Sequence, residues 1–176
     1  MIPDWMTSAP RPVDTVLVAN RGEIAVRVLR AAKESGLRGV AVYSDPDEGS
    51  LHVENADQAV HLPGTTLADT YLNGDAIIEA ARSTGAQAIH PGFGFLSERA
   101  DFANAVKAAG LIWIGPPADA IDTMGDKISA RRCMIESGVP VIPGEEISIG
   151  GDSDHLGVLA SAAARVGYPL LLKASA

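Results

Sequence analysis

The residues at positions 90–94, with the sequence HPGFG, form the stretch of the chain most suited to hold a ligand. They follow a short apolar run, residues 86–89, that predicts a buried strand. Because glycine has no Cβ atom, Gly92 and Gly94 let the backbone approach another molecule while the ring of Phe93 faces it. The alternative is a tight turn whose phenylalanines pack into the core.

Two lysines lie at positions where a positive charge is unfavourable unless an anion binds beside it. Lys173 follows the apolar run 168–172, which predicts a strand, and burying its charge without a partner would be costly. Lys127 begins a predicted helix, where the positive helix end disfavours a cation. Both positions favour contact with a negatively charged ligand. In the alternative, the side chains simply extend into solvent.

A charged stripe follows the first predicted helix. Glu23, Arg27, Arg30 and Glu34 recur at helical spacing and therefore share one face. Such a face is either an exposed one, where each ion pair contributes about 0.2–0.5 kcal/mol, or a surface that meets another protein chain.

Composition excludes several classes of function. The 176 residues are 47% hydrophobic and 20% charged, as in ordinary globular proteins. A net charge of −8 argues against a nucleic-acid or membrane partner, which would need a basic surface. The single cysteine, Cys133, cannot form an intrachain disulfide and fits a cytoplasmic protein. With one cysteine and scattered histidines, no metal site is expected, and His90 is predicted to be structural.

The elements that position these residues alternate between strand and helix. Such βαβ units have right-handed crossovers, so we predict an open parallel sheet with helices on both faces over residues 13–125, after a flexible leader at 1–12. The predicted strands are Thr15–Ala19, Gly39–Tyr43, Gln58–Leu62, Ala86–Ile89 and Leu111–Ile114, and the predicted helices run from Glu23 to about Gly36, from Asp75 to Ser83, and through the amphipathic run Phe102–Ala109.

Residues 126–176 differ in character and are predicted to begin a second domain that they do not complete. A short helical turn at Asp119–Met124 leads into this part. The predicted elements within it are helices at Lys127–Glu136 and Leu156–Val166, a short strand in residues 139–143, and a strand at Leu170–Lys173.

Four segments together resemble the front of the biotin carboxylase family. They are residues 16–25 (VLVANRGEIA), 87–98 (QAIHPGFGFLSE), 124–127 (MGDK) and 167–176 (GYPLLLKASA). The resemblance runs from about Thr15 to Ala176. It implies a Rossmann-like domain that precedes an ATP-grasp domain (a pre-ATP-grasp domain), followed by the incomplete start of the ATP-grasp domain itself.

The resemblance also implies an activity: ATP drives the joining of bicarbonate to biotin on a carrier protein, for transfer to an acyl-CoA. ATP, Mg²⁺ and carrier-bound biotin are then the cofactors, and a biotin carboxyl carrier and a carboxyltransferase are the partners. By the same resemblance, Lys127 and Lys173 contact ATP, Gly92, Phe93 and Gly94 form the biotin-pocket loop, and Arg27, Arg30 and Glu34 lie at a homodimer interface. Phe93 departs from the tyrosine that is more usual in the family.

We expect this chain to be inactive by itself and to bind no cofactor tightly, with no catalytic or metal-binding residue of its own. Two alternatives stay open. One is a non-catalytic nucleotide-binding or oligomerisation module, which the charged stripe supports. The other is a different ATP-grasp ligase, of the carbamoyl-phosphate-synthetase kind, although the loop at 90–98 matches the biotin branch.

Overall fold

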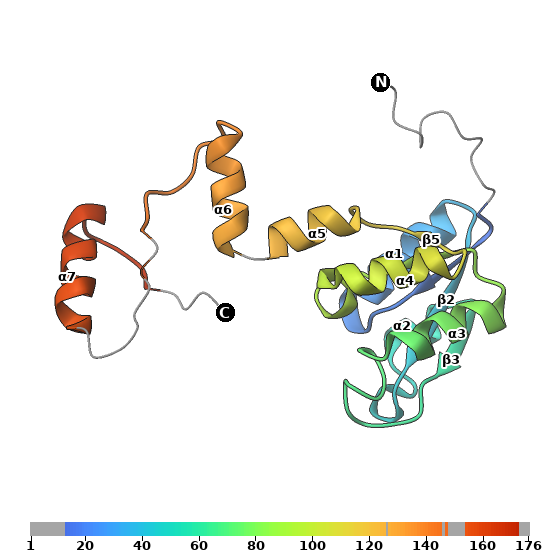
Figure 1. Ribbon diagram of the computed structural model, residues 1–176. Helices are drawn as coiled ribbons and strands as arrows, with labels where there is room; N and C mark the ends of the chain where they lie inside the picture. Colours follow the sequence, from blue (N-terminus) through green and yellow to red (C-terminus); the bar gives the residue numbers. More distant parts are fainter. Residues whose placement is uncertain (1–12, 126, 146, 148–153, 173–176) are drawn as a thin grey trace, which may run out of the picture. The chain divides into compact units, whose positions relative to one another are not determined.

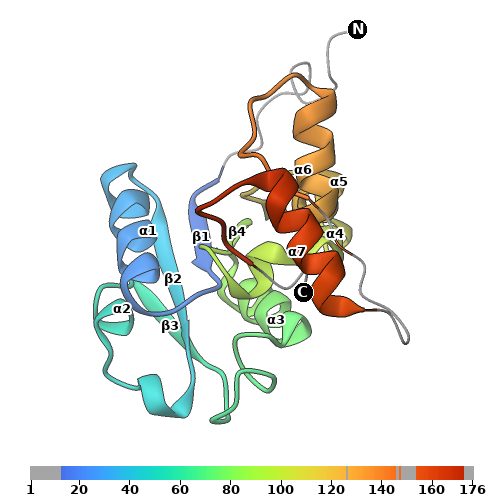
Figure 2. The same cartoon turned by 90° about the vertical axis from the view of Figure 1, so that its left-hand side faces the viewer.

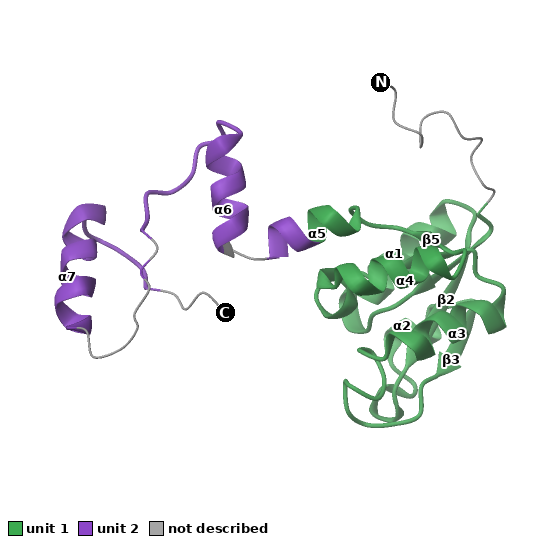
Figure 3. Cartoon of the chain, in the orientation of Figure 1, with its two compact units in different colours: residues 1–121 green, residues 122–176 purple. Residues whose placement is uncertain are grey.

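The protein is described from a computed structural model, which describes residues 13–125, 127–145, 147 and 154–172. The chain divides into two compact units, residues 1–121 and 122–176 (Figure 3). Each unit is treated by itself below.

The first unit contains a five-stranded sheet in which every pair of neighbouring strands is parallel (Figure 1). The strand order is β3-β2-β1-β4-β5. Side chains on both faces of the central strands are buried, as is usual for parallel sheets covered on both sides. The strands are β1 (Thr15–Val18), β2 (Arg38–Tyr43), β3 (Gln58–His61), β4 (Ala88–His90) and β5 (Ile112–Trp113). This confirms the predicted open parallel α/β fold.

The strand order reverses beside β1. Val18 pairs with Ala41 of β2 on one side and with His90 of β4 on the other. The chain therefore runs outward from β1 to β3 and then returns past both strands to β4. In open α/β sheets, ligands bind outside the carboxyl ends of the strands at such a reversal. The predicted ligand loop follows β4 and lies at this point.

Helices cover the sheet on both faces (Figure 2). On one face, Ala25 and Leu29 of α1 (Gly22–Glu34) pack against Val18 and Ala41. On the other face, a larger cluster joins Leu17 and Val40 to α3 (Gly74–Thr84) and α4 (Ala100–Ala108). The α1 helix forms because its apolar residues recur at helical spacing and so line one face.

Three short elements complete the first unit. They are η2 (Asp45–Asp47), α2 (Leu51–Glu54) and η3 (Phe95–Glu98). None of them was predicted from the sequence, because a single turn has too few residues to show a periodic pattern. The helix α5 (Ala118–Gly125) follows β5, and Ile121 is buried in the larger cluster.

The second unit contains two further helices, α6 (Lys127–Glu136) and α7 (His155–Val166), both as predicted. The Asp154 side chain caps α7 by accepting a hydrogen bond from the Gly157 amide at 3.0 Å. Arg131 donates hydrogen bonds to the carbonyl groups of Ile142 and Gly144, and Arg165 forms an ion pair with Glu145.

Two strands predicted in this unit are wrong. Residues 139–143 and 170–172 contain no strand, and Ile142, Leu171 and Leu172 are largely exposed. An extended segment needs a neighbouring strand to satisfy its backbone groups, and none of the described residues pairs with either segment. Lys173 lies outside the described residues. In the described part of the chain, no helix is both long enough and apolar enough to cross a bilayer.

Candidate functional site

Asn20 connects the end of β1 to the loop that follows β4. Its buried amide group donates hydrogen bonds to the carbonyl oxygens of Pro91, at 2.7 Å, and of Phe93, at 2.9 Å. Its side-chain oxygen accepts a hydrogen bond from the Arg21 amide at 2.9 Å. One buried side chain therefore fixes the backbone on both sides of Gly92.

Gly92 is required at its position for two reasons. Its φ of 69° lies in the left-handed region, which disfavours side chains. A Cβ atom at Gly92 would also lie only 2.7 Å from the Asn20 Nδ2 atom. The close approach seen at Gly92 is to the Asn20 amide of the same chain, and the predicted approach of this loop to a ligand stays a prediction.

The two phenylalanines of the loop point in different directions. Phe93 is 62% exposed, whereas Phe95 packs against the larger core cluster and Leu96 is buried. The Ser97 hydroxyl donates a hydrogen bond to the Gly94 carbonyl at 2.7 Å, which closes the turn after Phe93. The alternative interpretation, in which both phenylalanines pack into the core, is therefore wrong for Phe93, whose ring is exposed to solvent.

His90 has the structural role that the sequence predicted. Its Nδ1 atom accepts a hydrogen bond from the Gly92 amide at 3.0 Å, and its carbonyl oxygen accepts one from the Ala19 amide at 2.8 Å. Burial lowers the pKa of His90. The neutral imidazole that results is the form able to accept at Nδ1.

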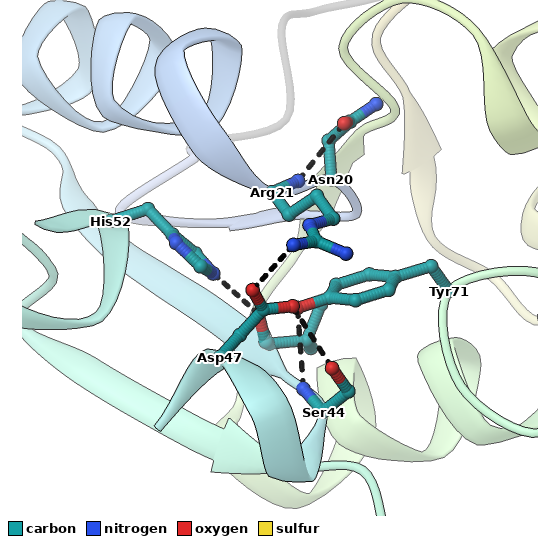
Figure 4. A network of polar contacts seen from close by, with 7 residues as sticks. Asn20, Arg21, Ser44, Asp47, His52 and Tyr71 are labelled. Carbon is teal, nitrogen blue, oxygen red and sulfur yellow. Dashed lines mark hydrogen bonds and ion pairs between the residues drawn. The ribbon is translucent and has the colours of Figure 1, made fainter. Parts of the chain in front are cut away.

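A polar cluster is centred on the buried Asp47 (Figure 4); Ser44 and Tyr71 are buried with it, whereas Arg21 is partly exposed. One carboxylate oxygen of Asp47 lies 2.7 Å from the Arg21 Nη2 atom. The other accepts hydrogen bonds from the Tyr71 hydroxyl at 2.7 Å and from the Ser44 hydroxyl at 2.9 Å. The Tyr71 oxygen in turn accepts a hydrogen bond from the Ser44 amide at 3.2 Å. We call Arg21, Ser44, Asp47 and Tyr71 the Asp47 cluster.

Aromatic contacts extend the Asp47 cluster toward the loop. The Arg21 guanidinium lies 5.6 Å from the centre of the Tyr71 ring, a cation–π contact. The Tyr71 ring stacks on Phe95, with centroids 5.8 Å apart and planes 13° from parallel. Burial and the hydrogen bond to Asp47 raise the pKa of Tyr71 to about 12, so its hydroxyl stays a donor at neutral pH.

His52 of α2 lies beside this cluster and is almost fully buried (Figure 4). Its Nε2 atom is 3.3 Å from the Val42 carbonyl, so the N–H group is on Nε2. Its Nδ1 atom has no hydrogen-bond partner among the described residues. Desolvation lowers the pKa of His52, which keeps the ring neutral. Asp45, by contrast, forms an exposed pair with His61 at 2.6 Å.

The predicted interface residues lie on α1, away from the contacts that hold this loop. Arg27, Arg30 and Glu34 are exposed on α1, where the Arg30 Nε atom lies 3.8 Å from a Glu34 carboxylate oxygen. Lys127 begins α6, and its side chain is not described. Together with Lys173, which lies outside the described residues, it keeps its ATP-binding role as a prediction. In the described part of the chain, no group of His, Cys, Asp and Glu side chains is suited to hold a metal ion.

The strand order and the loop at the reversal point define an open, doubly wound α/β domain. The chain belongs to the biotin carboxylase N-terminal domain family: the model of the family described as "Biotin carboxylase, N-terminal domain" matches residues 12–121.

Curated relatives agree with this assignment. Methylcrotonoyl-CoA carboxylase subunit alpha, mitochondrial, of Dictyostelium discoideum is 49% identical over 93% of this chain and 23% of its own length. The biotin carboxylase of Haemophilus influenzae is also 49% identical, over 93% of this chain and 36% of its own length. The chain thus spans about a quarter to a third of these relatives.

Solved structures give the same result. The biotin carboxylase domain of a single-chain bacterial carboxylase has a TM-score of 0.77 and 47% identity, covering 90% of this chain and 36% of that one. The biotin carboxylase domain dimer of Hydrogenobacter thermophilus 2-oxoglutarate carboxylase, in complex with MgADP, ADP and bicarbonate, has a TM-score of 0.78 and 43% identity, with 94% and 36% covered. These relatives favour the carboxylase interpretation over the two alternatives.

Proposed function

We propose that this chain supplies the amino-terminal part of an ATP-dependent biotin carboxylase, which joins bicarbonate to biotin on a carrier for transfer to an acceptor such as an acyl-CoA. The family match over residues 12–121 carries the proposal. The exposed Phe93 ring, on a loop at the carboxyl edge of the sheet, supports it by offering a surface for a flat ligand.

In this proposal, Gly92, Phe93 and Gly94 border the biotin pocket, and Lys127 and Lys173 contact the ATP phosphates. The described residues fit the first role: the loop backbone is fixed from below by Asn20, and one ring is left exposed. ATP and Mg²⁺ would supply the phosphoryl chemistry, in which a protein acts mainly by positioning groups and neutralising charge. The bound MgADP and bicarbonate of the Hydrogenobacter domain support ATP, Mg²⁺ and bicarbonate as ligands of the complete enzyme.

The proposed partners are a biotin carboxyl carrier, a carboxyltransferase and a second copy of the enzyme. A cytoplasmic location belongs to the same proposal and rests on the single cysteine. For the homodimer, the support is the exposed stripe of Arg27, Arg30 and Glu34 on α1. Beside this helix, an apolar groove of about 360 Å³ is lined by Ile24, Val28, Ala31 and Leu37, among others.

The test is ATP-dependent fixation of labelled bicarbonate onto free biotin. We expect fixation by the complete polypeptide that contains this chain, and none by the 176 residues alone. Fixation by the 176 residues alone would contradict the proposed division of the active site. A complete polypeptide that binds ATP and bicarbonate but never carboxylates biotin would overturn the function.

Phe93 provides a sharper measurement in the complete enzyme. Because the exposed ring is proposed to contact biotin, Phe93→Ala should raise the KM for biotin about tenfold and leave the KM for ATP unchanged. Phe93→Tyr keeps the ring and is the matched control. If both variants changed the KM for biotin equally, the Phe93 ring would not be part of the biotin pocket.

A further inference from the structure

We propose that Arg21, Asp47 and Tyr71 act as a positioning unit, which holds the loop of residues 91–98 in the shape that presents Phe93. The effect on loop shape follows from contacts within the first unit alone. Its consequence for biotin rests on the proposed function, so the two are tested separately below.

The first step is that Asp47 ties together three segments distant in sequence. Arg21 follows β1, Asp47 follows β2, and Tyr71 lies in the connection between β3 and α3. The contacts of Asp47 with Arg21 and Tyr71 span 26 and 24 residues. All three segments follow the carboxyl ends of strands, so one carboxylate fixes their spacing at that edge of the sheet.

The second step is the link from Tyr71 to the loop. Hydrogen bonds with Asp47 and the Ser44 amide fix the position of the Tyr71 hydroxyl, and full burial of the ring fixes its plane. Phe95 stacks on that plane. Phe95 has a φ of 49°, a left-handed conformation that residues other than glycine adopt only when their surroundings impose it.

The third step is that the loop is held from two sides. Asn20 holds the carbonyl groups of Pro91 and Phe93, and Tyr71 holds the ring of Phe95. Only Gly94 separates the two attachments. Asn20 and Arg21 are neighbours joined by a further hydrogen bond, so the attachments meet in one short segment after β1. Phe93 is itself the end of the first attachment and lies two residues before the second, so it has little freedom to turn inward.

The fourth step concerns charge. The Asp47 carboxylate is buried, and among the described residues the cation paired with it is Arg21. A buried carboxylate that loses a donor keeps its desolvation penalty without compensation, so the cluster rearranges when a member is changed. Three functional groups that depend on one another in this way behave as a unit.

The first experiment measures amide hydrogen exchange by NMR in the 176-residue chain. Tyr71→Phe removes the hydroxyl and keeps the ring, and Asp47→Asn removes the charge with little change in shape. Matched controls exist: Tyr43→Phe changes a tyrosine that stacks on His61, and Asp45→Asn changes the carboxylate of the exposed pair with that histidine. The loop amides of Gly92 and Ser97 are compared with the sheet amide of Ile112, which donates to Gln87.

We expect both cluster variants to raise exchange at Gly92 and Ser97 about tenfold relative to Ile112, and both controls to leave this ratio unchanged. If loop and sheet amides accelerate equally, the cluster stabilises the whole unit and positions nothing in particular, which overturns the proposal. The absence of any acceleration at Gly92 and Ser97 overturns it as well. Should Asp47→Asn fail to fold, Tyr71→Phe decides alone.

The second experiment uses the complete carboxylase and steady-state kinetics. Tyr71→Phe should raise the KM for biotin about tenfold while the KM for ATP stays constant, because only the loop has moved. Adding Phe93→Tyr to the Tyr71→Phe variant should not restore the KM for biotin, because the hydroxyl group was lost at position 71. A loosened loop with unchanged biotin kinetics would overturn the role proposed for Phe93 and leave the positioning unit intact. If the loop amides exchanged no faster in Tyr71→Phe, the positioning unit would be overturned, whatever the KM for biotin.

Discussion

Asn20 and Gly92 depend on each other. The Asn20 amide occupies the space that a side chain at position 92 would need, and in return it satisfies two carbonyl groups of the loop. A change of either residue alone should therefore lower the stability of the folded protein. A larger residue at 92 strikes the amide, and a smaller residue at 20 leaves buried backbone oxygens without donors.

A double-mutant cycle tests this dependence. Gly92→Ala should cost about 2 kcal/mol in the free energy of unfolding, part from the contact with Asn20 and part from the left-handed backbone. In an Asn20→Ala background the contacts with the amide group are gone and only the Cβ atom of residue 20 stays 3.0 Å away, so the same change should cost about 1 kcal/mol less. Urea unfolding of the four proteins gives the coupling. The control is Asn55→Ala at an exposed hydrogen bond, and strict additivity would contradict the prediction.

Two histidines, the buried His52 and the partly buried His90, make stability depend on pH. Burial lowers the pKa of His52 and His90 below the ordinary value of 6.5. Below that value the unfolded chain binds protons that the folded chain does not, so stability falls as the pH drops from about 6.5 toward the folded pKa values. Asp47 and Arg21 face His52 and act on its charge in opposite directions.

We therefore expect His52→Gln to flatten the dependence of the urea midpoint on pH below about pH 6.5, because its amide can still donate to the Val42 carbonyl without titrating. Asn55→Ala, at an exposed hydrogen bond of a residue that does not titrate, should leave the slope as it is. A slope that is the same in wild type and His52→Gln would show that His52 titrates normally.

At the scale of elements, the docking of α1 onto the sheet rests on a small cluster. Leu29 is 2% exposed, and its Cδ2 atom fills the space above Gly39 of β2. Leu29→Ala should destabilise the protein by about 2–4 kcal/mol, because few neighbours can move to fill the space. Leu51→Ala, where the side chain is 68% exposed, should change the unfolding free energy by less than about 0.5 kcal/mol. Similar costs for the two changes would mean that α1 is not held by this cluster.

Much of the first unit could be predicted from the sequence because its signals are local. Buried runs such as residues 15–18 show the strands, and helical spacing shows α1 and α3. The Asp47 cluster could not be predicted, since its contacts join residues 24 and 26 positions apart that share no periodic pattern. One signal was present: Tyr71 is a tyrosine in a short polar connection, and a buried tyrosine needs a partner for its hydroxyl.

The second unit shows the opposite outcome. An apolar run such as Leu170–Leu172 has the composition of a strand, yet strand structure also requires a neighbour to pair with, which composition does not reveal. The helices α6 and α7 were predicted correctly because a helix satisfies its own backbone. The domain limits at 13–125 and 126–176 stay a prediction.

At the scale of the whole molecule, the exposed stripe on α1 predicts self-association. In the complete enzyme, Arg27→Glu together with Arg30→Glu should halve the mass seen by sedimentation, because the stripe is proposed to face a second copy. The matched control, Arg82→Glu with Lys107→Glu, makes the same change of charge on α3 and α4. If the α1 variant kept the mass of the wild type, the stripe would not be part of the interface.

The position of β1 in the sheet has a consequence for biosynthesis. β1 can pair with β2 soon after both leave the ribosome, since only α1 separates them. Its other neighbour, β4, arrives much later, and Asn20 meets Pro91 across 71 residues. The segment that presents Phe93 is therefore shaped late, on a half-sheet already assembled, and only α4, β5 and the start of α5 follow it within the first unit. A nascent chain that stops before β4 exposes one edge of β1, which is where chaperones would be expected to bind.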